Sequence, residues 1–142
     1  MTMFLLTLAL GCGGKALPTT TIKVKDIPIT VELAVNDETR ARGLMHRASM
    51  GTDDGMLFIY PESRPRSFWM KDTKIPLSIA FVDPAGEIVK IADMQPLSTA
   101  TTKSVYPAKY AIEMNQGWFE QHGIKKGDHV ADLPKDDAVD VR

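Results

Sequence analysis

The sequence predicts a mainly β protein, an antiparallel β-sandwich with one or two short helices. Residues 22–35 contain two runs in which apolar and polar residues alternate, separated by a break at 26–28. Turn-forming residues at 51–55 and 83–86 separate further short apolar runs. Hairpins at this spacing are typical of antiparallel sheets rather than of parallel sheets with crossover helices. A length of 142 residues with 44% hydrophobic content suits one domain.

The first twelve residues have the pattern of a bacterial lipoprotein signal. Residues 4–10 form an apolar run that is too short to span a bilayer and is typical of a secretory signal peptide. The only cysteine, Cys12, follows this run where lipoprotein processing would attach lipid. We predict a signal peptide at 1–11, a lipid anchor on Cys12 and a flexible linker at 12–20, in an exported protein at the cell envelope that faces the periplasm or the cell exterior. The alternative is a buried N-terminal strand with an inert thiol.

Residues 21–135 are predicted to form a single domain, followed by a charged, frayed tail at 136–142. After the hairpin, Asn36 is a good N-cap, and the apolar spacing predicts a helix of about three turns that ends near His46. Gly43 within it weakens this helix. The remaining predicted elements are strands at 56–60, 67–70, 77–82, 87–94, 110–114 and 127–133, a loop at 96–107 and a short helix at 117–122.

Six segments resemble one known family in the order in which they occur: RARGLMHR, DDGMLFIY, SFWMKDTKIPLSIAFVD, GEIVKIADM, YAIEMNQG and IKKGDHV. Together they resemble the family catalogued as domain of unknown function 192, small and often exported prokaryotic proteins, over about residues 29–133. The resemblance implies a jelly-roll-like β-sandwich with short helices, and it implies no activity. The family usually has an acid after I-P-L, where this chain has Ser78. This difference argues against an enzyme that depends on that acid.

The segment Phe68-Trp69-Met70-Lys71 is the first candidate site. Neighbouring residues in a strand point to opposite faces, so we predict that Phe68 and Met70 face inward and that Trp69 lies beside Lys71 on the second face. An aromatic ring next to a cation suits a sugar or a small anion. Arg42, within the RGLM motif, would add a bidentate donor for a carboxylate or phosphate. The alternative is that the helix at 36–46 covers Trp69 and that no ligand binds.

Two other arginines of this region, Arg40 and Arg47, are interpreted as solvated charge on an exposed helix, paired with Glu38 or Asp37. Glu113 is expected on the same second face as Trp69, because the other face of the 110–114 strand carries Tyr110, Ile112 and Met114. We interpret Glu113 as the partner of Arg42 or Lys71 in an ion pair, which would lower its pKa.

Other kinds of site have little support in the sequence. A formal net charge of −1 offers no basic surface for nucleic acid. The histidines lack metal-binding spacing and most methionines lie on signal or strand patterns, so no metal site and no cofactor is predicted. Nucleophile-elbow, P-loop and dinucleotide-binding motifs are absent.

The sequence therefore favours a membrane-anchored protein that binds a small polar or anionic ligand through Arg42, Trp69, Lys71 and Glu113. One alternative is a hydrolase or transferase that uses Glu113 or Asp72 as its acid or base. The other is a structural partner in an envelope complex that docks through an exposed apolar patch.

Overall fold

The computed structural model describes residues 16–142, so the predicted signal peptide at 1–11 and Cys12 lie outside the described residues. The elements, in chain order, are β1 (Thr19–Val24), β2 (Ile27–Ala34), α1 (Asp37–Arg42), β3 (Asp54–Arg64), β4 (Ser67–Phe68), β5 (Leu77–Val82), β6 (Ile88–Met94), β7 (Thr102–Lys103), β8 (Ala108–Asn115), α2 (Trp118–Gln121) and β9 (Val130–Ala131). Within the described part of the chain, neither helix is long and apolar enough to cross a membrane.

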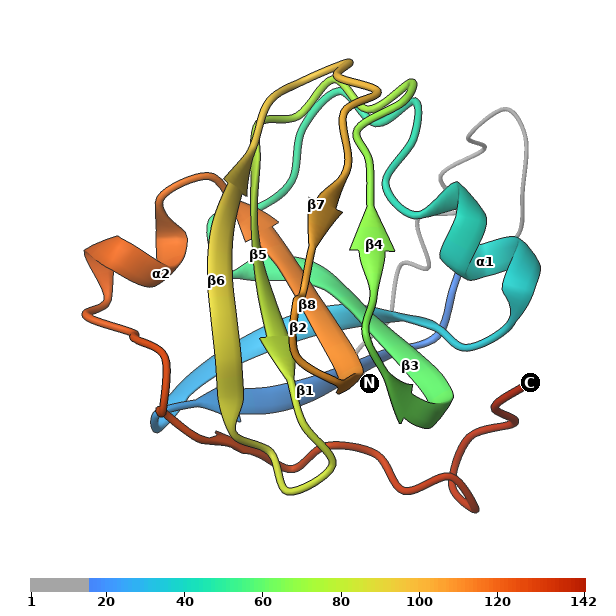
Figure 1. Cartoon of the computed structure of the whole chain (residues 1–142), viewed down its shortest axis with the longest axis vertical. Helices are drawn as coiled ribbons and strands as arrows, with labels where there is room; N and C mark the ends of the chain where they lie inside the picture. Colours follow the sequence, from blue (N-terminus) through green and yellow to red (C-terminus); the bar gives the residue numbers. More distant parts are fainter. Residues whose placement is uncertain (1–15) are drawn as a thin grey trace, which may run out of the picture.

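Seven strands form one curled sheet in the order β6-β5-β8-β3-β2-β1-β9, and β4 and β7 form a separate two-stranded ribbon (Figure 1). Neighbouring strands are antiparallel except for β2 and β3, which are parallel and joined through α1. The predicted fold class, mainly β with two short helices, is confirmed. The parallel pair was not predicted, because sequence periodicity does not show which strands become neighbours.

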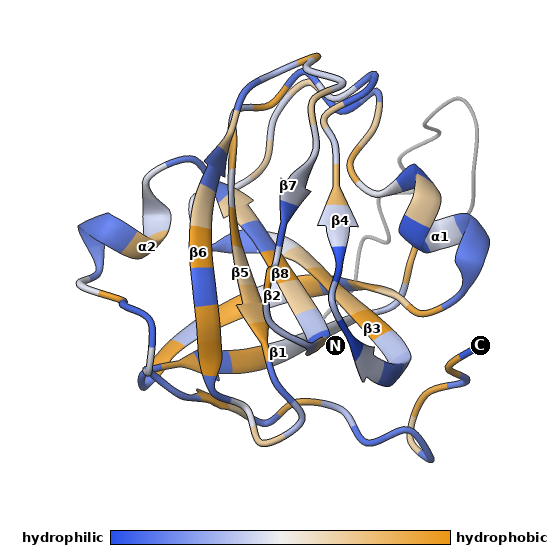
Figure 2. Ribbon diagram, viewed as in Figure 1, coloured by the Kyte–Doolittle hydropathy of each residue, from blue (hydrophilic) through white to orange (hydrophobic). Residues whose placement is uncertain are grey.

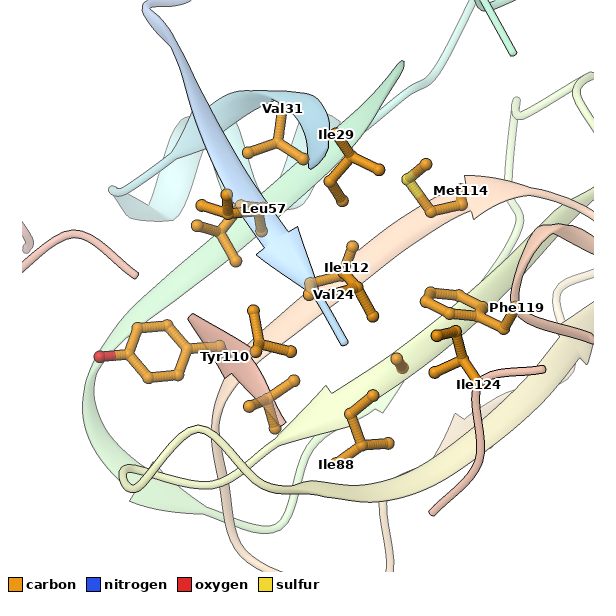
Figure 3. Packing of buried hydrophobic residues seen from close by; sticks show 14 of the residues in the cluster. Val24, Ile29, Val31, Leu57, Ile88, Tyr110, Ile112, Met114, Phe119 and Ile124 are labelled. Carbon is orange, nitrogen blue, oxygen red and sulfur yellow. The ribbon is translucent and has the colours of Figure 1, made fainter. Parts of the chain in front are cut away.

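The first hydrophobic cluster fills the inside of the curled sheet (Figure 3). Alternate residues of the central strands point into it, such as Leu57 of β3 and Ile112 of β8. Trp118 and Phe119 of α2 pack edge to face against each other, with ring centroids 5.3 Å apart. The Trp118 indole N–H donates a hydrogen bond to Asp53 at 3.0 Å. This bond gives a buried indole the polar partner that it needs.

The second hydrophobic cluster lies on the other face of the same central strands. Its members include Phe58 of β3, Phe81 of β5 and Phe68 of β4. The Phe68 ring meets Phe58 at a centroid distance of 5.0 Å and Phe81 at 5.7 Å, both in edge-to-face arrangements. Because both faces of the sheet are covered, β5 is buried along its whole length. Figure 2 shows this arrangement: the central strands carry many hydrophobic residues, and the two helices are largely hydrophilic.

Helix α1 begins where predicted and ends earlier. The Thr39 N–H donates to Asn36 Oδ1 at 2.8 Å, which caps the first turn. Gly43 has a φ of 49°, a conformation that residues with a Cβ rarely adopt. The helix therefore ends at Arg42 instead of near His46. This early end gives α1 only six residues, and the helix buries no apolar side chain.

Other boundaries also differ from the prediction: the predicted loop at 96–107 contains β7, and β9 is shorter than the strand predicted at 127–133. β3 continues past Pro61, where the ladder with β8 shifts register, and a proline is tolerated at such an irregularity. The strand predicted at 67–70 is shortened to β4. The tail at 136–142, expected to be frayed, carries Val139 and Val141 against the first cluster, and the Arg142 N–H donates to the Val35 carbonyl at 2.9 Å. Burial of the two valines offsets the entropy cost of ordering this segment.

Candidate functional site

A cavity of about 250 Å³ lies between α1 and the second face of the sheet. Residues of α1, of the turn that follows it and of β3, β4 and β8 contribute to its lining. Three of the four predicted ligand-binding residues line it, namely Arg42, Trp69 and Glu113. Arg42 is the last residue of α1, and Trp69 directly follows β4. The fold thus brings Arg42 and Glu113, which are 71 positions apart in the chain, to one cavity.

The alternation predicted at 68–70 is confirmed. Phe68 and Met70 are buried, whereas Trp69 is 47% exposed. The Met70 N–H bonds to the Ser98 carbonyl at 2.8 Å, which holds this segment in position although the strand itself is short. The alternative interpretation required Trp69 to be covered by the helix. The exposure of Trp69 contradicts that interpretation. The Trp69 ring forms one wall of the cavity.

Lys71 lies beside Trp69 but not in the cavity. Its ammonium nitrogen is 5.4 Å from the centroid of the Trp69 ring, within the range of a cation–π contact. Asp72, the other carboxyl considered as an acid or base, is also absent from the lining. Its backbone has a φ of 54°, and its carbonyl accepts the His46 N–H at 2.9 Å. Of the two carboxyls proposed for catalysis, only Glu113 is in the cavity.

Glu113 lies on the predicted face of β8, but its environment differs from the prediction. Its neighbours across the sheet are Met56 of β3 and Ile79 of β5, both buried, and the residue itself is 4% exposed. Among the described residues, no hydrogen bond or ion pair involves its carboxyl group. Burial therefore raises the pKa of Glu113 to about 8. The expected ion pair with Arg42 or Lys71, and the lowered pKa, are wrong.

Arg40 and Tyr60 belong to the cavity and were not predicted as site residues. The Arg40 side chain is only 7% exposed and donates to the Ile59 carbonyl at 2.8 Å and to Asp37 at 3.0 Å. Its guanidinium carbon is 4.9 Å from the centroid of the Tyr60 ring, and that of Arg66 is 3.7 Å away. Burial raises the pKa of the Tyr60 hydroxyl, while the charges of Arg66 and Arg40 oppose this effect. The alternation of β3 could have revealed Tyr60, because it shares a face with Phe58.

Ser78 lies elsewhere, next to β6. Its hydroxyl donates to Asp93 Oδ1 at 2.6 Å and accepts the Gly117 N–H at 3.0 Å. The two bonds tie β5 to β6 and to the start of α2, which is a structural role. Within residues 16–142, no cluster of three or more histidine, cysteine or acidic side chains could hold a metal ion.

Comparisons with known proteins agree with the fold. Residues 20–131 match the family DUF192, described as an uncharacterized ACR. The chain is similar to a crystal structure from Sinorhizobium meliloti 1021, described as a candidate transcription regulator, with 35% identity and a TM-score of 0.79 over 83% of this chain and 96% of that one. It is also similar to a protein of unknown function from Novosphingobium aromaticivorans DSM 12444, with 31% identity and a TM-score of 0.75 over 80% of this chain and 85% of that one.

No curated protein matches the sequence. The family match, in contrast, extends from the second residue of β1 to the end of β9. The chain belongs to the DUF192 family.

Proposed function

We propose that this protein binds a small polar or anionic molecule in the cavity beneath α1. The observation that supports this function most directly is a buried carboxyl group, that of Glu113, which faces a cavity and has no partner among the described residues. Buried polar groups are normally hydrogen-bonded, so such a group is a candidate for contact with a ligand. Arg42 and Trp69 line the same cavity and add a cation and an aromatic wall.

The size of the cavity limits the ligand. Small-molecule pockets typically measure about 300–1,000 Å³, and this cavity is slightly smaller, at about 250 Å³. It suits a monosaccharide or a small organic acid better than a nucleotide. The Sinorhizobium protein is described as a regulator of transcription, but a formal net charge of −1 gives the present chain no overall electrostatic attraction for DNA.

A thermal-shift screen of the purified chain against sugars, polyols, organic acids and metal ions tests the function. A ligand present at a hundred times its Kd stabilises the folded state by about 2.7 kcal/mol, which raises Tm by several degrees in a domain of this size. Trp69→Ala should abolish the shift. Tyr106→Ala is a matched control, because Tyr106 is also 47% exposed and does not line the cavity.

The proposal holds if a compound stabilises the wild type and Tyr106→Ala but not Trp69→Ala. It fails if no compound of these classes raises Tm. It also fails if every stabilising compound acts equally on Trp69→Ala, because the ligand would then bind elsewhere.

We also propose that the domain is tethered to a membrane at the cell envelope through a lipid on Cys12, after removal of residues 1–11. The support is the apolar run at 4–10 followed by the only cysteine. In the native host, the protein should fractionate with membranes and partition into detergent, and Cys12→Ser should prevent lipid attachment. A wild-type protein without lipid mass on Cys12 would contradict the tether.

A hydrolase or transferase is a second candidate, and one observation favours it. A carboxyl with a pKa of about 8 in a cavity is suited to donate a proton near neutral pH. The only other carboxyl in the lining, Asp37, has a fully exposed side chain that pairs with Arg40. Turnover of any compound found in the screen, abolished in Glu113→Gln while binding remains, would favour the enzyme over the binding protein.

A further inference from the structure

The carboxyl group of Glu113 opens into the cavity. In the described part of the chain, every side-chain oxygen or nitrogen that is sealed from solvent has a hydrogen-bond partner. Glu113 has no such partner among these residues, and yet it is nearly completely buried. Its carboxyl oxygens must therefore reach solvent, and the cavity is the space that this residue lines.

The groups that surround this carboxyl leave it without a counter-ion. On its own sheet it is flanked by Met56 of β3 and Ile79 of β5, which are apolar. Beyond them, β3 contributes Tyr60 to the cavity, and β4 and the loop after it contribute Ser67, Phe68, Trp69 and Thr73.

The charges of the lining come from α1 alone. They are Asp37, Arg40 and Arg42, and Arg40 is bonded to Asp37 and to the Ile59 carbonyl. An isolated carboxylate in such a place is costly, so the group is held as a neutral acid. A neutral carboxyl has one O–H donor, which is available to a ligand in the cavity that Glu113 lines.

The lining selects the charge of the ligand. A cation would meet two arginines, Arg40 and Arg42, which oppose it. With Glu113 neutral, the three other charges of the lining sum to +1, which suits a monoanion better than a dianion such as phosphate. The Trp69 and Phe68 rings supply apolar surface for a short carbon body. The Arg42 guanidinium has five N–H donors, so it can contact a ligand in addition to its other interactions.

We propose that the cavity binds a small monocarboxylic acid in its ionised form, with one carboxylate oxygen accepting a hydrogen bond from the Glu113 carboxyl and Arg42 supplying the opposite charge. This inference rests on the proposed function and names the chemical class of its ligand. Glu113 and the ligand share one proton between two carboxyl groups. Such charge-assisted O–H···O⁻ bonds are among the strong ones in proteins.

Binding is therefore linked to a proton. The ligand carboxylate is ionised above about pH 5, and Glu113 must keep its proton to donate the bond. The pKa of about 8 places the loss of that proton at mildly alkaline pH. Affinity is constant between about pH 6 and 7.5 and falls tenfold for each pH unit above about 8.

The test is a titration of the purified full chain with sodium propionate and sodium benzoate, monitored by NMR at constant ionic strength. Propionamide and benzamide are the uncharged controls. In the wild type we expect an affinity at pH 9.5 that is about 30-fold lower than at pH 6.5. Glu113→Gln keeps an N–H donor and cannot ionise, so its affinity should change less than twofold over the same range. Tyr106→Ala should behave as the wild type.

The outcomes separate the ligand class from the function itself. Three results would each overturn the proton-linked carboxylate site. The affinity of the wild type is the same at the two pH values, the affinity of Glu113→Gln falls as much as that of the wild type, or the amides bind as tightly as the carboxylates. Binding of a neutral sugar that is lost in Trp69→Ala, with no binding of either carboxylate, overturns the ligand class and leaves the proposed function standing. Absence of binding by every class overturns both.

Discussion

Replacement of Glu113 by glutamine should stabilise the protein, and the gain should increase with pH. The pKa of Glu113 is about 8 in the folded chain, compared with 4.5 for an unperturbed group. Between these values the unfolded chain releases the proton and the folded chain keeps it. The free energy of unfolding of the wild type therefore falls as pH rises, by about 1.4 kcal/mol per pH unit. Over the whole interval the loss approaches about 5 kcal/mol.

Glu113→Gln removes this loss, because the amide has nearly the shape of the neutral acid and does not ionise. We expect the variant to match the wild type within about 1 kcal/mol at pH 4.5 and to exceed it by about 3 kcal/mol at pH 7 and about 5 kcal/mol at pH 9. Urea denaturation monitored by tryptophan fluorescence gives these values. Glu38→Gln, on the exposed side of α1, controls for the loss of one charge and should change stability by less than about 0.5 kcal/mol. The reasoning would be refuted if the free energies of unfolding of Glu113→Gln and wild type differed by the same amount at pH 4.5 and at pH 9.

Two further predictions concern the sheet. Ser78→Ala should lower the free energy of unfolding by about 1–3 kcal/mol, because the hydroxyl bonds to Asp93 and to a backbone N–H. Ser78→Asp should lower the free energy of unfolding more at pH 7 than at pH 5, because the new carboxyl would lie beside that of Asp93, where a hydrogen bond of 2.6 Å now lies. Urea denaturation at both pH values measures this loss, and an equal loss at the two pH values would contradict the prediction. Gly55→Ala should destabilise by about 3 kcal/mol or more, since a Cβ would lie 2.3 Å from the Glu113 carbonyl oxygen. Gly123→Ala, which has open space but a φ of +67°, should cost only about 1 kcal/mol, and equal melting temperatures of the two variants would contradict the clash.

Alternation within strands was the reliable part of the sequence prediction. It placed Phe68 and Met70 inward, Trp69 outward and Glu113 on the face opposite Ile112, and each placement is observed. Alternation is imposed by the local geometry of an extended backbone, so it survives whatever the strand packs against. The same information brought Trp69 and Glu113 into one hypothesis, because both were assigned to the second face, and Arg42 was added on the strength of the RGLM motif.

The environments of the charged residues could not be predicted in this way. Arg47 forms a bidentate ion pair with Glu32, at 2.7 Å for both contacts, across 15 positions of sequence. Glu113 was expected to have an ion-pair partner and has none among the described residues. Arg40 pairs with Asp37, which was one of the two predicted partners, but its side chain is buried against Tyr60 and not solvated. Each of these outcomes depends on which segments become neighbours in space, and that depends on the parallel pairing of β2 and β3 through α1.

The position of Glu113 is difficult to explain by stability alone. Its neighbours in the sheet, Met56 and Ile79, show that the same layer accepts apolar side chains, and an apolar residue at 113 would avoid a cost of several kcal/mol above neutral pH. Helix α1 lies over this layer and buries no apolar side chain of its own, and a cavity remains between the helix and the sheet. A costly acid beneath a helix that leaves room for a ligand is the combination expected where stability is given up for binding. If Glu113→Gln is more stable and binds carboxylates without pH dependence, the acid is retained because it makes binding respond to pH, and not because the fold requires it.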